Sequence, residues 1–89
     1  MKAENILRMT LKKEWFDQIV AGTKKKEYRD HSPYWEARLL GRKYDSILFV
    51  NGYSKTSPTV LVEYKGYKLD QSQGQYIISL GKILKASKA

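Results

Sequence analysis

The stretch TVLVEYKGY, residues 59–67, decides how the sheet of this protein is shaped. Residues 59–65 are rich in valine, leucine and other side chains that favour a β-strand. Gly66 then stands between two tyrosines, and a glycine inside a strand pattern is typical of a bulge or a sharp bend. Because such a bend lets a short sheet curl, we expect a curved sheet rather than a flat one.

Strand-like runs also lie on both sides of this stretch. Residues 46–51 come before it and residues 75–80 after it, with turn residues at 52–58 and 70–74 between the runs. With the extended segments of the first half, this makes about five strands, and closing such a sheet removes edges that would otherwise be exposed. The predicted fold class is therefore α+β: a small mixed β-barrel of about five strands with two short α-helices.

The first half of the chain begins with a strand and a helix. Alternating apolar residues predict a strand over residues 6–12 with one buried face. Residues 14–21 then carry apolar side chains at helical spacing, and Gly22 stands where a helix commonly stops. We expect the aromatic residues of this helix, Trp15 and Phe16, to lie in the core.

A second strand and helix follow. Residues 24–29 lack helical periodicity and are expected to be extended or irregular. Ser32 is a suitable N-cap and Pro33 suits the first helical position, so a second short helix is expected to end near Gly41. At the other end of the chain, residues 85–89 are expected to form a frayed tail.

Composition limits the chemistry that this chain can perform. Residues 1–89 are expected to form a single domain, with the core over residues 5–84. There is no cysteine and one histidine, which excludes disulfides, thiol nucleophiles and Cys- or His-built zinc sites, and no metal or cofactor is expected. No apolar run is long enough to cross a membrane, and the N-terminus lacks the apolar stretch of a signal peptide. A cytoplasmic protein without membrane contact is therefore expected.

The charge of the chain favours an anionic partner. Lysine and arginine number 17 against 9 acidic residues, which gives a net charge of +8. Such a surface attracts polyanions, and the seven tyrosines supply rings on which unpaired bases can stack. RNA is therefore a candidate partner. The alternative is that the lysines keep a small protein soluble while the tyrosines fill a β-rich core.

The segment GTKKKEYRD, residues 22–30, holds the strongest candidate site. Lys24 and Arg29 can bind phosphate, while Glu27 either orients these cations or accepts a hydrogen bond from a base edge. In a catalytic alternative, Lys24 is a general base, since its lysine neighbours disfavour its charged form, and Glu27 is a proton acceptor. In a regular strand Lys24 would point away from Glu27, so the three side chains converge only if Lys24 lies on the turn after Gly22.

Other candidates are expected to border this segment. Three of them form one turn and offer an amide, a ring and a hydroxyl that can read a base, although an ordinary Asn-Gly turn explains them equally well. Two lie three apart on the second helix, and the tryptophan of this pair is alternatively a core residue. The last is a cation at the end of the first strand. These ligand-binding candidates are Lys12, Trp35, Arg38, Asn51, Tyr53 and Ser54.

The run LKKEWFDQIVAGTKKKEYR, residues 11–29, resembles the signature of the ASCH domain family, which is Gly-x-Lys-x-x-Glu-x-Arg after a short amphipathic helix. Later pieces agree in their order: YWEARL, FVNGYS, VEYKGY and QYIISLGKIL. The resemblance covers residues 5–84 and is to compact bacterial and phage members. It implies a PUA-like barrel associated with RNA, with a cleft lined by the signature residues.

The resemblance also implies alternatives for the function. Some ASCH relatives resemble amidohydrolases that deacetylate N4-acetylcytidine with a lysine, a threonine and a downstream glutamate, and others are ribonucleases. Lys24 matches the lysine, Glu27 takes the place of the threonine, and Glu63 is an acidic residue in the comparable later region. The expected function is binding of RNA or a nucleotide-like ligand. A hydrolase of a modified nucleoside or of RNA is the alternative, and a module that binds an acidic protein is a third.

Overall fold

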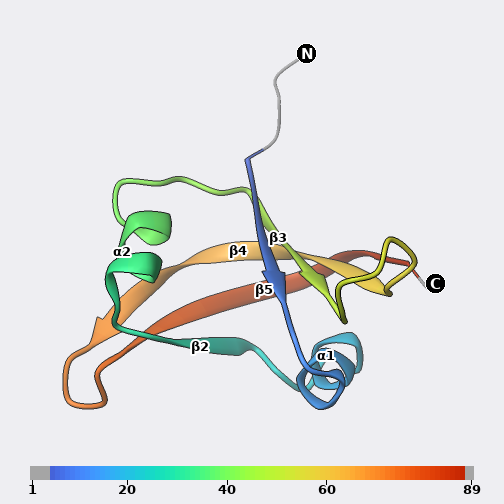
Figure 1. The fold of residues 1–89 in the computed structure, drawn as a ribbon, viewed down its shortest axis with the longest axis horizontal. Coiled ribbons are helices and arrows are strands. Elements are labelled where there is room, and N and C mark those ends of the chain that lie inside the picture. Colours follow the sequence, from blue (N-terminus) through green and yellow to red (C-terminus); the bar gives the residue numbers. More distant parts are fainter. Residues whose placement is uncertain (1–4, 88–89) are drawn as a thin grey trace.

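The computed structural model describes residues 5–87 and has five strands and two helices in this range (Figure 1). The predicted α+β class is confirmed, since the strands form one curled mixed sheet, a half-barrel that the two short helices flank. Within the described range no helix is long and apolar enough to cross a membrane. The elements are β1 (Ile6–Thr10), α1 (Lys13–Val20), β2 (Lys26–Asp30), α2 (Pro33–Leu39), β3 (Ser46–Val50), β4 (Thr59–Asp70) and β5 (Gln75–Ser87).

The sheet has the strand order β1-β3-β4-β5-β2, so β1 and β2 are its two edges. β1 runs parallel to β3, and the other neighbouring strands are antiparallel. In Figure 1, β1 crosses in front of the long strands β4 and β5 as the sheet curls. No backbone ladder joins the two edges in the described residues; instead, Arg29 of β2 donates from Nη2 to the Thr10 carbonyl of β1 at 3.5 Å. The barrel is therefore open along a seam between β1 and β2.

Gly66 bends β4 as its place in the sequence predicts. Its φ of +102° lies in the left-handed region that glycine tolerates, and the register between β4 and β5 shifts between Tyr64 and Tyr67. The strand continues through this bulge to Asp70, beyond the expected end at residue 65. A long bent strand can pair with two different stretches of β5, which is how a small sheet curls.

β5 is longer than the sequence predicts. Thr59 pairs with Ser87 and Leu61 pairs with Lys85, so the chain is still in the sheet at Ser87. The expectation of a frayed tail from residue 85 is therefore wrong as far as Ser87, because the first part of β4 gives these residues a hydrogen-bonding partner. Positions 88–89 of the expected tail, and positions 1–4 at the N-terminus, lie outside the described residues.

The hydrophobic core lies inside the curl, and α1 contributes to it with one edge only. Phe16 and Ile19 are buried, but Trp15 is 41% exposed and Val20 is 43% exposed. The expectation that Trp15 lies in the core is therefore wrong, because this short helix turns only a narrow stripe toward the sheet. The buried core residues are Leu7, Met9, Leu11, Phe16, Ile19, Leu39, Ile47, Phe49, Val60, Val62, Tyr76, Ile78 and Leu80.

The ends of the helices agree with the sequence signals. Gly22 has a φ of +80° just after α1, as expected for a glycine that stops a helix. Ser32 caps α2, since its Oγ accepts a hydrogen bond from the Trp35 backbone N–H at 3.4 Å, and Pro33 occupies the first position. These two boundaries determine where β2 can begin and end, and so they position the segment between the helices.

Glu63 on β4 has a structural role at the irregular pairing with β5. Its Oε1 accepts a hydrogen bond from the Lys82 backbone N–H at 3.1 Å, and Lys65 Nζ lies 3.8 Å from the same oxygen. Gly81 leaves the space that this carboxylate occupies, because a Cβ there would lie 2.5 Å from Glu63 Oε1. The side chain thus supplies a bond that the backbone ladder lacks at this point.

This bond predicts how stability depends on pH. The hydrogen bond from Lys82, aided by the nearby charges of Lys65 and Lys82, lowers the pKa of Glu63 against a smaller opposing effect of desolvation. The stabilisation is therefore complete above the pKa of Glu63 in the unfolded chain and is lost as the pH falls through its lower pKa in the folded chain. Glu63→Gln keeps an acceptor but does not titrate. The free energy of unfolding, measured at several acidic pH values, should fall less steeply with decreasing pH in this variant than in the wild type. Identical pH dependence of the two proteins would contradict the role of the carboxylate.

Candidate functional site

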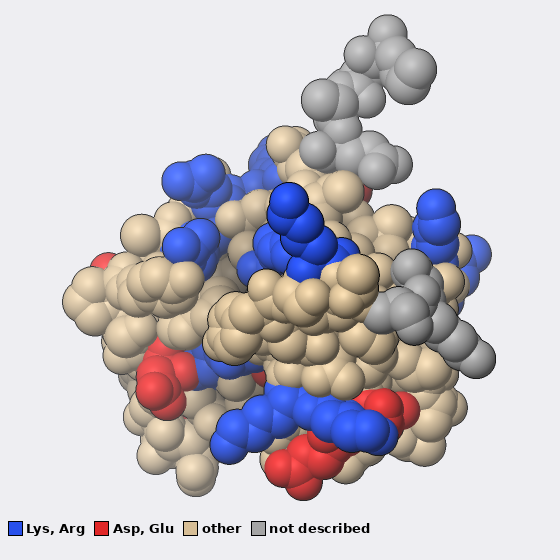
Figure 2. Space-filling model, turned by 45° about the vertical axis from the view of Figure 1, so that its right-hand side comes forward, with Lys and Arg blue, Asp and Glu red and all other residues tan. Residues whose placement is uncertain are grey.

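A cleft of about 850 Å³ lies beside the seam between β1 and β2. The end of β1, the middle of β2, the start of α1 and the loop after β3 meet there, and no strand of the described residues lies between them. Figure 2 shows lysine and arginine side chains in several groups across one face of the molecule, with uncharged surface between them. The residues that line the cleft are Thr10, Leu11, Lys12, Trp15, Lys24, Glu27, Tyr28, Arg29, Asn51, Gly52 and Tyr53.

Glu27 is the centre of the cleft's charge arrangement. It is 5% exposed, its Oε2 lies 2.7 Å from Arg29 Nη2, and its Oε1 lies 3.4 Å from Lys24 Nζ. Glu27 and Arg29 project from the core face of β2, in register with the buried residues Ile78 and Tyr76. β2 begins only after Lys24, which confirms that Lys24 lies on the turn and lets the three side chains converge. In this geometry Glu27 orients both cations.

Two exposed rings flank Lys24. Its Nζ lies 5.4 Å from the centroids of both Trp15 and Tyr28, which are 41% and 46% exposed. Such cation–π contacts help to hold the ammonium over the cleft. Sequence reasoning assigned Trp15 to the core and did not single out Tyr28. The sequence does contain a signal for Tyr28. It stands between Glu27 and Arg29, and alternation along a strand predicts that its ring is exposed on the face opposite to theirs.

Arg29 links the cleft to α2. Its guanidinium carbon lies 5.2 Å from the centre of the Trp35 ring, and Trp35 packs against the core from a half-buried position. The Nε atom of Arg29 is buried and has no hydrogen-bond partner among the described residues. Trp35 therefore supports Arg29 but does not itself line the cleft.

The loop after β3 contributes only part of what the sequence predicts. Asn51 and Tyr53 line the cleft, and Tyr53 is 95% exposed, so its ring is free to contact a ligand. Ser54 is outside the lining: its Oγ accepts a hydrogen bond from the Thr56 N–H at 3.1 Å, and its own N–H donates to Ser57 Oγ at 3.0 Å. Ser54 shapes the loop in this structure.

Of the three remaining residues that the sequence singles out, one lines the cleft and two lie away from it. Lys12 lines the cleft beside the start of α1. Arg38 stacks over Tyr34 on α2, with its guanidinium carbon 4.2 Å from the ring centre. Glu63 makes its contacts at the β4–β5 bulge, so it is not a partner of Lys24 in this geometry.

The cleft combines three cations and one carboxylate with aromatic walls. Among its described lining residues Glu27 is the one carboxylate, opposed by Lys12, Lys24 and Arg29. Within residues 5–87 no three His, Asp or Glu side chains are grouped so that they could hold a metal ion. No family model, curated protein or solved structure matches this chain.

Proposed function

We propose that this protein binds single-stranded RNA or a nucleotide-like ligand in the cleft beside the seam. The observation that carries the proposal is the buried carboxylate of Glu27, which holds Lys24 and Arg29 at the cleft, with Lys24 between two exposed rings. Cations bind phosphate, and aromatic faces stack on unpaired bases with little regard to sequence. The resemblance to the ASCH signature supports the same proposal, and with it membership of the PUA-like group.

The acidic residue in the cleft is compatible with an anionic ligand. Glu27 contacts two cations, and Lys12 adds a third to the lining, so the positive charges outnumber the negative one. Once a phosphate takes over one of these cations, an oxygen of Glu27 can accept a hydrogen bond from a base amino group such as cytosine N4–H₂. A ligand with both a phosphate and an amino-bearing base therefore suits both the cations and the carboxylate of the cleft.

Hydrolysis of a modified nucleoside is the second candidate function. The observation in its favour is that Lys24 Nζ and Glu27 Oε1 lie 3.4 Å apart at the cleft, within reach of one bound group. In this alternative Glu27 handles the proton of an attacking water, in the place where ASCH amidohydrolases have threonine. Conversion of N4-acetylcytidine to cytidine by the wild type, lost in Glu27→Gln, would favour catalysis over binding.

The proposal predicts that the affinity for RNA depends on the charge of Lys24 and on the aromatic ring of Trp15. Lys24→Ala should weaken binding of a fluorescently labelled single-stranded RNA and reduce the slope of log K against log salt by about 0.7, the value for one lost contact to a single strand. Trp15→Ala should weaken binding at least about fivefold, because it removes a stacking face. Fluorescence anisotropy at several salt concentrations measures both effects.

Matched controls lie next to the tested residues. Lys25 is an exposed neighbour that does not line the cleft, and Val20 is exposed on α1, also outside it. Lys25→Ala and Val20→Ala should therefore change the affinity much less than Lys24→Ala and Trp15→Ala. Equal effects of the two lysine variants would mean that RNA responds only to net charge, and no binding by the wild type would reject the proposal.

A further inference from the structure

The alternation of cations and aromatic rings continues beyond the cleft along α2. Arg29 contacts Trp35, whose ring meets Tyr34 edge to face with centroids 5.2 Å apart, and Arg38 lies over Tyr34 at 4.2 Å. Each member touches the next, from Glu27 at the cleft to Arg38 on the helix. We call Tyr34, Trp35 and Arg38 the α2 track. The cleft is therefore one end of a longer surface of the same chemical character.

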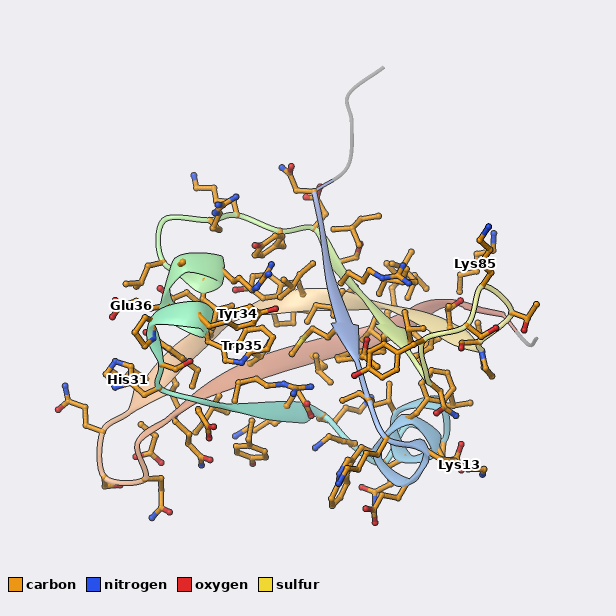
Figure 3. All side chains as sticks on the ribbon, viewed as in Figure 1. Lys13, His31, Tyr34, Trp35, Glu36 and Lys85 are labelled. Carbon is orange, nitrogen blue, oxygen red and sulfur yellow. The ribbon has the colours of Figure 1, made fainter. Side chains whose placement is uncertain are left out.

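Helix geometry gathers the α2 track on one side. Positions 34 and 38 are four apart and share a face with 35, whereas 36 points elsewhere. Figure 3 shows Tyr34 and Trp35 on the side of α2 that faces β1, and Glu36 and His31 on the other side. Glu36 Oε2 lies 3.8 Å from His31 Nε2, so the nearby acidic group is turned toward a different partner. The α2 track is thus uninterrupted by negative charge from its own helix.

The outer residues of the α2 track are not required by the core. Tyr34 is 57% exposed and Arg38 is also exposed, while Leu39 is the buried residue of this helix. Arg38 holds the fold through its backbone, since its carbonyl accepts a hydrogen bond from the Tyr44 hydroxyl at 2.6 Å. The side chains of Tyr34 and Arg38 are therefore free to serve a ligand without disturbing the packing beneath them.

We propose that Tyr34 and Arg38 form an outer subsite for a nucleotide that flanks the one in the cleft, so that the ligand is an extended single strand of RNA. This inference rests on the proposed function and adds the length and path of the ligand. The base stacks on the Tyr34–Arg38 pair, and the phosphate between the two nucleotides lies toward Arg29, with Trp35 as the wall in between. Interleaved cations and rings along a path are what single-strand binding proteins use. An acidic peptide would engage the cations but would leave the rings unused.

A length series tests this inference. Binding of cytidine monophosphate and of an oligocytidylate of about eight nucleotides is measured by isothermal titration for the wild type, Tyr34→Ala and Arg38→Ala. The wild type should bind the longer RNA more tightly. Both variants should weaken binding of the longer RNA at least about fivefold more than they weaken binding of the mononucleotide. Tyr34→Phe keeps the ring, and Arg42→Ala removes an exposed arginine outside the α2 track, so both should behave like the wild type.

The outcomes separate this inference from the proposed function. If the mononucleotide binds and the longer RNA gains nothing, the outer subsite is rejected while the cleft proposal stands. If neither ligand binds, both are rejected. If oligoglutamate displaces the longer RNA and its own binding is weakened equally by Tyr34→Ala and Arg38→Ala, the α2 track is a surface for an acidic protein and the inference is wrong. Circular dichroism of each variant confirms that the fold is kept.

Discussion

Replacing Glu27 with alanine is expected to lower the free energy of unfolding by about 3 kcal/mol. The Glu27 side chain is 7% exposed and faces Lys24 and Arg29, whose side chains are 13% and 24% exposed. Its removal leaves two partly buried cations side by side without their carboxylate. Because both cations keep some contact with water, the expected loss lies at the lower end of the range for a broken buried ion pair. Urea denaturation followed by circular dichroism measures it.

Two further variants identify the cause of this loss. Glu14→Ala removes an exposed carboxylate from α1 and should change the stability by no more than about 0.5 kcal/mol. Glu27→Gln keeps the shape and an acceptor but removes the charge, so it should cost less than Glu27→Ala and leave RNA affinity equal or higher. A loss in Glu27→Ala no greater than in Glu14→Ala would contradict the central role of this carboxylate. Abolished RNA binding in a folded Glu27→Gln would mean that binding needs the negative charge of this residue and not only an acceptor.

Replacing Gly81 with alanine is expected to destabilise the fold by about 2 kcal/mol. A Cβ at this position would lie 2.5 Å from Glu63 Oε1, 2.7 Å from Glu63 Cβ and 2.8 Å from Lys65 Cε. The carboxylate and the lysine can turn aside, but the Cβ of Glu63 is fixed to the β4 backbone. Making room therefore separates β4 from β5 locally and breaks the Glu63–Lys82 hydrogen bond. The thermal unfolding midpoint of the variant measures the effect.

The same substitution in a second background tests the mechanism. In Glu63→Ala the carboxylate and its hydrogen bond are already absent, while the Cβ remains. Gly81→Ala should therefore cost less in that background than in the wild type, and the difference is the coupling between the two positions. An equal cost in both backgrounds would show that the carboxylate takes no part in the clash.

The features that the sequence predicts well depend on local backbone preferences. Gly66 produces a bend because few other residues adopt its φ, and Ser32 begins a helix because its hydroxyl is next to free N–H groups. The position of Lys24 on a turn follows in the same way, since Gly22 stops α1 just before it. Residue type and spacing, together with the resemblance to the ASCH signature, also predict several polar residues that the structure gathers at the cleft: Lys12, Lys24, Glu27, Arg29, Asn51 and Tyr53.

The features that the sequence does not predict depend on tertiary contacts between residues that are far apart in the chain. Trp15 has the spacing of a core residue, but the short α1 sits at the open seam, where no helix or strand between residues 5 and 87 covers this ring. Residues 85–87 look like a polar tail in the sequence, yet they pair with the first residues of β4. The bend at Gly66 leaves this first part of β4 free to pair with the end of β5. In both cases the deciding partner is distant in the chain.

The contact of Arg29 with the Thr10 carbonyl also has a consequence for ligand entry. Within residues 5–87 this flexible side chain spans the seam between β1 and β2, and no backbone ladder does, so the contact can be broken by rotation about side-chain bonds while every ladder stays intact. A guanidinium that leaves the Thr10 carbonyl to meet a phosphate would widen the mouth of the cleft as it binds. Under the proposed function, the same guanidinium therefore both opens the cleft to the ligand and binds it.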